Sequence, residues 1–384
     1  MPHAETAGRA IDALLDRVLA EQRLVGAVVL IHQDGRPFYS KAVGFADREA
    51  GTPMQADTVF RLASMTKPIV SAAALAAAEA GLLSLEDDIT RFLPDFRPKT
   101  PEGDDARITV RHLLTHTSGL SYGFLQPGES VYHKAQISDG IDRPGIGLAE
   151  NLRRLAKLPL NFTPGAAWLY SLGTDVLGAV LEKASGQSLP AVVQDRITRP
   201  LGMADSAFLA PAPERLATPY ADPAEAGRAP RRMTEPFALP QAEAGTVYFS
   251  PGRATDPNAY PSGGAGMVGT AADYIRFLEA IRLGGAPILS ADSAAAFIGD
   301  AIPGLDIDLG DPGWGFGLGV SHLRDPAAAA TPQSVGSWAW GGVYGTSFWV
   351  DPETGISAVA LTNTSLEGCN GLFTKEIVAA AYAE

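Results

Sequence analysis

A proline at the start of an alanine-rich run constrains the fold of this chain more than any other residue. Residues 69–81 have the small, apolar composition of a buried helix, and Pro68 stands immediately before them. Proline cannot lie deep inside a helix, because its ring clashes with the carbonyl group four residues back. The helix must therefore begin just before Pro68, near Ser64.

Ser64 and Lys67 form the only Ser-x-x-Lys sequence in the chain. Residues three apart share one face of a helix, so the Lys67 amine can reach the Ser64 hydroxyl. A serine becomes a strong nucleophile when a nearby base takes its proton, and the free N–H groups at a helix N-terminus can hold an oxyanion. A capping serine followed by a solvated lysine would leave the same pattern. A lysine on a buried helix needs a further reason, however, because an unpaired buried charge is costly.

Composition limits the partners that this chain can have. Its 384 residues are 46% hydrophobic, which suits one large domain or two ordinary ones, and its net charge of −13 argues against nucleic acids and membrane surfaces as partners. A single cysteine excludes an internal disulfide. No signal peptide and no apolar stretch of membrane-spanning length are found, so we expect a cytoplasmic protein. The oligomeric state stays open.

Strand-like runs occur near both ends of the chain. The first pair flanks the turn residues Asp34-Gly35, a strong hairpin signal, and amphipathic helices precede the first pair and follow the last. These features predict an α/β (α+β) fold in which one antiparallel sheet, built from both termini, is flanked by the N- and C-terminal helices. The predicted strands cover residues 26–32, 38–45, 347–350 and 356–362.

The middle of the chain has helical periodicity and few strand-like runs. We therefore predict an α/β domain from residues 1–74 and 214–384, a mainly helical domain from residues 75–213, and an active site in the cleft between them. The Pro- and Ala-rich segment 209–260 is expected to be a long loop that covers one side of the cleft and limits substrate size. Expected helices within and after this region include 110–115, 148–157, 174–185 and one that begins at Thr270 with a capping box.

Three further motifs could complete a site around Ser64. Tyr170 lies at the junction before a predicted helix, and Trp340-Gly341-Gly342 lies beside a predicted strand, where glycines allow close approach of a substrate or a second backbone. Tyr132 is a plausible aromatic wall of the cleft. Taken alone, each motif has a simpler interpretation: a core tyrosine for Tyr132 and Tyr170, and a strand bend for the glycines.

Ser64-x-x-Lys67, Tyr170 and Trp340-Gly341-Gly342, in this order and spacing, resemble the family VIII carboxylesterases. These are esterases with the fold of class C β-lactamases and penicillin-binding serine hydrolases. The resemblance extends over nearly the whole chain. Further matching stretches are residues 60–63, 113–120, 263–270, 314–317 and 361–364.

The resemblance implies a role for each matching residue. Ser64 would be the acylated nucleophile, and Lys67 and Tyr170 would share the work of the general base, with the Lys67 ammonium favouring a phenolate-like Tyr170. The backbone N–H groups of Ser64 and Val343 would form the oxyanion hole. Trp340, Gly341 and Gly342 would line the acyl site, and Asp175 stands at a matching position without an assigned role. No metal ion and no cofactor are implied.

Two departures from the lactamase pattern favour esters as substrates. Leu172 stands where those lactamases have an asparagine, and Trp340 where they have a lysine, so the groups that hold a lactam amide and a drug carboxylate are missing. We expect a serine carboxylesterase for short-chain or small acyl esters, with possible side activity on cephalosporin-type β-lactams. The alternatives are a β-lactamase or D-aminoacyl peptidase, and a binding protein that is acylated but does not turn over.

Two other motifs are poorer candidates. Gly119-Leu120-Ser121-Tyr122-Gly123 fits the Gly-x-Ser-x-Gly pattern, but a helix ending near Gly119 is expected before it, where that nucleophile motif requires a strand. His112 and His116 have the spacing of a zinc helix, but a leucine replaces the catalytic glutamate, so structural or capping roles are expected.

Overall fold

The computed structural model describes residues 2–383, except 129, 144, 226, 242–243, 308 and 310–311; the side chains of residues 2–4 are also left undescribed. Its centre is an eight-stranded antiparallel sheet in the order β10-β11-β12-β13-β14-β1-β2-β3. The first long strand pairs with the last, with Leu30 opposite Val359, which confirms the predicted sheet built from both termini. The strands are β1 Gly26–Gln33, β2 Arg36–Asp47, β3 Thr52–Pro53, β10 Trp314–Phe316, β11 Ser321–Leu323, β12 Trp338–Gly342, β13 Thr346–Asp351 and β14 Ile356–Thr362.

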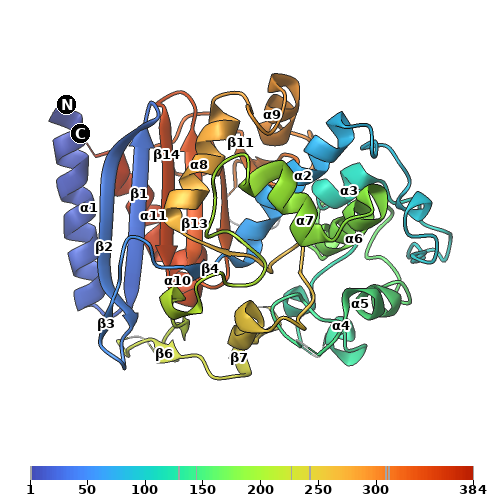
Figure 1. Ribbon diagram of the computed structural model, residues 1–384, viewed down its shortest axis with the longest axis horizontal. Coiled ribbons are helices and arrows are strands. Elements are labelled where there is room, and N and C mark those ends of the chain that lie inside the picture. The colour runs from blue at the N-terminus through green and yellow to red at the C-terminus, as the bar shows by residue number, and fades with distance from the viewer. Residues whose placement is uncertain are drawn as a thin grey trace.

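Helices cover both faces of this sheet (Figure 1). On one face, α1 (Pro2–Ala20) and α11 (Leu372–Ala381) pack together, so the two chain ends lie side by side. Val29 and Ile31 point toward these helices, whereas Val28 points to the opposite face, where α8 (Ala271–Arg282) packs. Both faces of β1 are therefore buried, as the mainly apolar sequence of that strand requires.

The helical part of the chain lies beside the sheet, with α2 (Thr66–Glu79) between them. Pro68 is the third residue of α2, which confirms the predicted helix start. The predicted boundary at residue 75 falls inside α2, and the division into two domains stays a prediction. The other helices of this part are α3 Val110–Leu114, α4 Val131–Lys134, α5 Leu148–Leu155, α6 Gly173–Ser185 and α7 Leu189–Val193.

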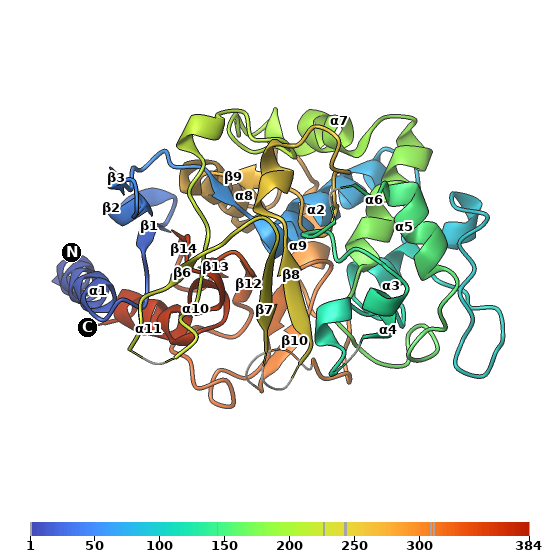
Figure 2. The ribbon, with the colours of Figure 1, turned by 90° about the horizontal axis from the view of Figure 1, so that it is seen from below.

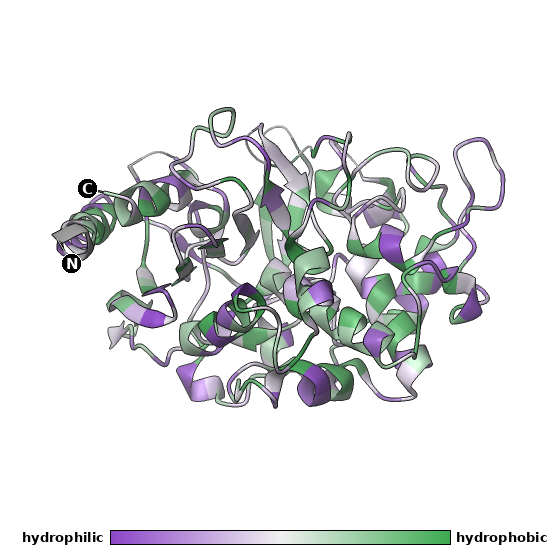
Figure 3. Cartoon of the chain, turned by 90° about the horizontal axis from the view of Figure 1, so that it is seen from above, coloured by the Kyte–Doolittle hydropathy of each residue, from purple (hydrophilic) through white to green (hydrophobic). Residues whose placement is uncertain are grey.

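Hydrophobic and hydrophilic residues alternate along many of these helices (Figure 3), as expected for helices with one buried face. The helix α8 begins at the predicted place, and the Thr270 hydroxyl caps it by accepting a hydrogen bond from the Asp273 N–H at 3.2 Å. The Asp273 carboxylate accepts from the Asp205 N–H instead of returning to Thr270, so only half of the predicted capping box forms. No helix in the described ranges combines the length and apolarity that crossing a membrane requires.

The segment 209–260 is not the single long loop that its composition suggests. It contains short strands, and its β7–β8 hairpin lies between the sheet and the helical part (Figure 2). The Gly245 N–H donates to the Phe124 carbonyl oxygen, which joins the hairpin to the helical part. A further pair of short strands, β4 and β9, joins residues just before Ser64 to residues just after Gly266. The short strands are β4 Phe60–Arg61, β5 Tyr220–Ala221, β6 Arg231–Arg232, β7 Phe237–Pro240, β8 Thr246–Phe249 and β9 Val268–Gly269.

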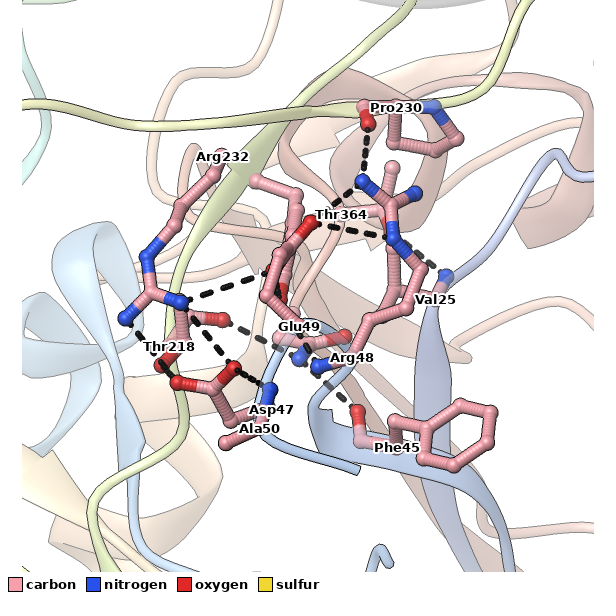
Figure 4. Close-up of polar contacts among 12 residues, drawn as sticks. Val25, Phe45, Asp47, Arg48, Glu49, Ala50, Thr218, Pro230, Arg232 and Thr364 are labelled. Atoms are coloured by element: carbon pink, nitrogen blue, oxygen red, sulfur yellow. Dashed lines mark hydrogen bonds and ion pairs between the residues drawn. The ribbon is translucent and has the colours of Figure 1, made fainter. Parts of the chain in front are cut away.

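A group of polar side chains fastens this segment to the end of β2 (Figure 4). We call it the edge cluster, and it consists of Asp47, Arg48, Glu49, Thr218, Tyr220 and Arg232. Arg232 forms ion pairs with Asp47 at 2.9 Å and Glu49 at 3.5 Å. The Thr218 hydroxyl donates to Asp47 at 2.8 Å, and the Tyr220 hydroxyl donates to Glu49 at 2.5 Å. The first half of segment 209–260 is thus anchored to the sheet.

Candidate active site

Ser64 lies in a 3₁₀ turn, Ala63–Met65, that leads directly into α2. The preceding Ala63 has a φ of 44°, an uncommon conformation for a residue with a side chain. Met267 holds both sides of the turn: its carbonyl oxygen accepts from the Leu62 N–H at 2.9 Å, and its N–H donates to the Thr66 hydroxyl at 3.0 Å. The surrounding structure therefore fixes Ser64 in a strained, well-supported turn.

The structure brings the three predicted catalytic side chains together. The Tyr170 hydroxyl lies 2.5 Å from the Ser64 Oγ, and the Lys67 Nζ lies 3.3 Å from the same atom. Lys67 also donates to the carbonyl oxygen of Gly264 at 2.8 Å. Lys67 is only 1% exposed and Tyr170 only 5% exposed, so both groups contact Ser64 in a largely dry environment.

Burial determines the charge of Lys67. It lowers the pKa of the amine to about 7, although the negative charge of Asp175 opposes this shift. The Nζ lies 4.5 Å from the ring centre of Tyr170 and 5.0 Å from that of Tyr122, where the ring faces favour a cation. Because burial outweighs these contacts, a substantial fraction of Lys67 is uncharged near neutral pH and able to accept a proton.

The surroundings of Tyr170 favour the neutral phenol over the phenolate-like form that the family resemblance implies. Burial raises the pKa of its phenol, and the neighbouring Ser64 and Trp340 side chains offset only part of that rise. A buried phenolate would need a closer cation than this site provides, because desolvation disfavours the charged form. This direction favours a neutral Tyr170 phenol, which donates a hydrogen bond to Ser64 Oγ.

Trp340, Gly341 and Gly342 lie on β12. The Trp340 ring meets the Tyr170 ring edge-on at 5.4 Å between centroids, so it stands at the catalytic centre. A Cβ atom on Gly342 would lie 2.1 Å from the Leu62 carbonyl oxygen, and one on Gly341 would lie 2.9 Å from the Cys369 carbonyl oxygen. Close packing of β12 against the Ser64 turn therefore explains Gly342, and contact with a neighbouring backbone explains Gly341.

The two predicted oxyanion donors lie at the ends of these elements. The Ser64 N–H belongs to the 3₁₀ turn, and the Val343 N–H follows β12 directly. Across the described residues, the Val343 N–H donates to no protein group. The packing of Gly342 against Leu62 brings the two segments into contact, as a shared oxyanion site requires.

A group of buried polar atoms behind Lys67 was not predicted. The Tyr122 hydroxyl and both carboxylate oxygens of Asp175 are buried and make no hydrogen bond of ordinary geometry with the described protein groups. A Cβ atom on Gly264 would lie 2.5 Å from Asp175 Oδ2, 2.8 Å from the Tyr122 hydroxyl and 3.4 Å from Lys67 Nζ, so these atoms surround one glycine. Burial raises the pKa of Asp175 to about 6, with the Ser262 hydroxyl and Lys67 opposing that rise.

The sequence provides only partial evidence that Asp175 and Tyr122 lie beside Lys67. Asp175 stands at a position that matches the family, but its function was open. Tyr122 belongs to the Gly-x-Ser-x-Gly sequence, a pattern that draws attention to Ser121 and not to the tyrosine. Its ring stacks on Phe124 at 4.7 Å and lies 5.0 Å from the Tyr170 ring.

The structure places Tyr132 in the hydrophobic core instead of the cleft wall. Its side chain is 2% exposed, and its hydroxyl accepts a hydrogen bond from the Ser121 N–H at 3.1 Å. This contact uses the hydroxyl to satisfy a buried backbone donor, which is the simpler role that a tyrosine can have. The prediction of Tyr132 as a substrate contact is therefore wrong.

Ser121 and the two histidines have structural surroundings. The Ser121 hydroxyl is buried and donates to the Tyr122 carbonyl oxygen. The preceding helix α3 ends at Leu114, earlier than expected, so Gly119 is not a helix cap but a turn residue with a φ of 84°. His112 accepts a hydrogen bond from the Thr109 N–H as part of a capping box, and His116 packs against the Tyr170 ring at 4.9 Å.

The chain is similar to known proteins over nearly its whole length. The family described as Beta-lactamase matches residues 11–380. Esterase EstB from Burkholderia gladioli is 48% identical over 377 residues, which cover 97% of this chain and 94% of that protein. The solved structure of EstCE1, a hydrolase with promiscuous acyltransferase activity, superimposes with a TM-score of 0.93 at 40% identity over the whole of both chains. A simvastatin synthase from Aspergillus terreus shares the fold, with a TM-score of 0.76 at 23% identity, over 98% of this chain and 95% of its own.

Proposed function

The chain belongs to the Beta-lactamase family and is a serine carboxylesterase of that fold, and from this premise we propose that Ser64 is the nucleophile that its ester substrates acylate. The 2.5 Å contact between the hydroxyls of Tyr170 and Ser64, with Lys67 beside them, carries this proposal. A nucleophile, a base and a second proton-handling group within hydrogen-bond reach are what acyl transfer requires.

In the acylation step, neutral Lys67 accepts the proton of the Ser64 hydroxyl as Ser64 Oγ attacks the ester carbonyl carbon. The carbonyl oxygen becomes an oxyanion, which the N–H groups of Ser64 and Val343 stabilise. When the bond to the alcohol breaks, the Tyr170 phenol donates its proton to the leaving oxygen, and the Lys67 ammonium returns a proton to Tyr170. Water then attacks the acyl-enzyme, the same groups act in reverse, and the carboxylic acid leaves.

We propose small, neutral esters as the substrate class. The positions that hold a lactam amide and a carboxylate in β-lactamases are occupied here by Leu172, which is fully buried, and by Trp340, an aromatic wall. A substrate carboxylate beside Trp340 would find no cation at that position to replace its hydration, and truncating one partner of a buried charge pair costs roughly 2–5 kcal/mol. Hydrolysis of cephalosporin-type β-lactams is accordingly expected as a slow side reaction.

A second activity, acyl transfer to an alcohol, is proposed as an extension of the same chemistry. Tyr170 and Trp340 place aromatic rings beside the reacting groups. Such a wall favours a small organic alcohol over water next to the acyl-enzyme. The description of EstCE1 as a hydrolase with acyltransferase activity supports this proposal.

Steady-state rates on p-nitrophenyl butyrate and nitrocefin test the proposal. We expect p-nitrophenyl butyrate to be the far better substrate. Ser64→Ala should abolish the measurable esterase activity, and Ser121→Ala, the matched control, should retain it. Faster turnover of nitrocefin would identify a β-lactamase, and a persistent acyl adduct in time-resolved intact mass spectra, without turnover, would identify an acylated binding protein.

A further inference from the structure

A small cavity is lined in part by residues that follow Gly264 in the chain. Its volume is about 30 Å³, and the walls include Arg61, Arg253, Tyr344, Gly266 and Met267. We propose that this cavity binds one small monovalent anion, such as chloride, between the Arg61 and Arg253 guanidinium groups and the Tyr344 hydroxyl.

Two guanidinium groups at one cavity favour the binding of an anion. Arg61 donates to the carbonyl oxygens of Pro251 and Ala217, which uses three of its N–H groups, and Arg253 donates to those of Asp142 and Tyr260, which uses two. A guanidinium carries five N–H groups, so each side chain keeps donors to spare. No carboxylate in the described ranges forms an ion pair with either arginine.

The two carboxylates that act electrostatically on Tyr344 are engaged in other hydrogen bonds, and Asp175 also interacts with Arg253 from a distance. The Glu235 carboxylate accepts from the Ser250 hydroxyl and from the Gly252 N–H, each at 2.5 Å. Asp142 accepts from the Ser138 hydroxyl at 2.6 Å and from the Asp139 N–H at 2.9 Å. Both carboxylates act on the cavity only from a distance, so they reduce its positive charge without filling it.

The Tyr344 hydroxyl is an independent sign of a missing ligand. Tyr344 is 5% exposed, and its hydroxyl has no hydrogen-bond partner among the described protein groups. The Arg61 guanidinium lies 5.8 Å from the centre of its ring. A buried hydroxyl without a partner normally costs about 1–3 kcal/mol, and an anion in the cavity would accept its hydrogen bond.

The size of the cavity limits the ligand. One water requires about 10–15 Å³, so 30 Å³ holds roughly two waters or one monatomic halide. A substrate carboxylate carries its acyl chain with it and cannot fit. The ligand class is therefore a free halide or an ion of similar size, and this inference does not depend on the ester chemistry proposed above.

The position of the cavity connects it to catalysis. Arg61 precedes Ser64 by three residues, and Tyr344 follows the proposed oxyanion donor Val343. Gly266 and Met267 follow Gly264, whose carbonyl oxygen accepts the hydrogen bond of Lys67. One anion would thus hold together the three segments that carry the nucleophile, the oxyanion donor and the contact of the base, and so stabilise the fold and the active geometry together.

Thermal unfolding tests this inference without relying on enzyme activity. Protein dialysed into sodium gluconate is titrated with sodium bromide at constant ionic strength, as wild type and as Ser64→Ala. We expect the Tm to rise with bromide and to saturate in both proteins, because a ligand that binds the folded state stabilises it by mass action. A crystal soaked in bromide should show an anomalous peak between Arg61, Arg253 and Tyr344.

A mild variant and a control make the test decisive. Tyr344→Phe removes one hydrogen bond to the anion and should raise the bromide Kd about tenfold or more, whereas Arg231→Gln, at an exposed position outside the cavity, should leave it unchanged. Equal responses to bromide and gluconate, the absence of the anomalous peak, or a Tyr344→Phe affinity equal to that of wild type would each overturn the proposal and leave a cavity that holds only water.

Discussion

Two polar regions of this molecule handle charge in opposite ways. In the edge cluster at the end of β2, burial pulls the pKa of Asp47 upward, but hydrogen bonds from Ala50, Thr218 and Arg232 outweigh it and lower that pKa. At the catalytic centre, burial prevails: it lowers the pKa of Lys67 to about 7 and raises that of Asp175 to about 6. The environment of the edge cluster favours the ionised form of Asp47, whereas the environment of the catalytic centre favours the neutral forms of Lys67 and Asp175.

The difference reflects solvent exposure and hydrogen-bond partners. The Arg232 side chain is 48% exposed and pairs with two carboxylates, whereas Lys67 is 1% exposed and Asp175 lacks a hydrogen bond of ordinary geometry to the described groups. Exposed, paired charges fasten one segment to another at little energetic cost. Buried groups with pKa values near 7 cost stability, but they can exchange protons at physiological pH, which is typical of catalytic residues.

The largest expected effect comes from removing the buried amine. Lys67→Met should lower kcat by roughly 10²–10⁴, with a small change in KM, because it removes the proton acceptor of the transition state. The free energy of unfolding should fall by roughly 1–3 kcal/mol, because the buried Gly264 carbonyl oxygen loses its donor and the buried Asp175 carboxylate loses its nearby cation. Steady-state kinetics on p-nitrophenyl butyrate and urea unfolding measure the two quantities.

Lys41→Met is the matched control for this prediction, since Lys41 pairs with Asp12 at the protein surface. It should leave kcat unchanged. A Lys67→Met enzyme with wild-type kcat would exclude Lys67 from the chemistry and remove the contrast between the two regions.

Tyr170→Phe should have the next largest effect, and its size should depend on the leaving group. We expect a loss of about 10²-fold in kcat on ethyl butyrate, because the phenol protonates a poor leaving group, and a smaller loss on p-nitrophenyl butyrate, whose leaving group needs no proton. The ring contacts with His116 and Trp340 remain, so the variant should fold normally. Equal losses on both esters would show that Tyr170 is not the acid.

The pH dependence of kcat/KM tests the electrostatic interaction between Asp175 and Lys67. The amine must be neutral to accept a proton, so activity should fall as the pH drops through about 7, where Lys67 becomes charged. Asp175→Asn removes the negative charge that raises the Lys67 pKa, and the acid limb should move to lower pH. Asp47→Asn, in the edge cluster, should leave the limb in place. If the acid limb of the Asp175→Asn profile does not move, then Asp175 does not influence the group that controls this limb.

Much of the fold was predictable because its signals are local. Pro68 sets the start of α2, and Asp34-Gly35 sets the turn between β1 and β2. The strands β7 and β8 were missed, since four-residue strands carry almost no periodic signal, and their pairing depends on contacts with distant residues such as Phe124.

The candidate site shows the same division. Ser64, Lys67 and Tyr170 follow from motifs whose order in the chain carries information. The surroundings of Tyr132 and Tyr122 do not, because a single tyrosine in a loop gives no sign of whether it faces the core or a cleft. The group around Gly264 depends on tertiary contacts that join residues 67, 122, 175 and 264, and no sequence pattern records those contacts.

The smallest expected effect lies in the edge cluster. Arg232→Ala should lower the free energy of unfolding by only about 0.2–1 kcal/mol, because an exposed ion pair gains little over its hydrated parts, and kcat should not change. Because Asp47 has a lowered pKa in the folded state, this contribution is complete at neutral pH and disappears as the pH falls below the ordinary carboxylate pKa of 3.8. The difference between wild type and variant should also shrink with added salt. Urea unfolding at two pH values and two salt concentrations checks both trends.

A loss of several kcal/mol in the Arg232→Ala variant, or a fall in its kcat, would show that the attachment of segment 209–260 to β2 supports the active site directly. The edge cluster and the catalytic centre would then be energetically coupled.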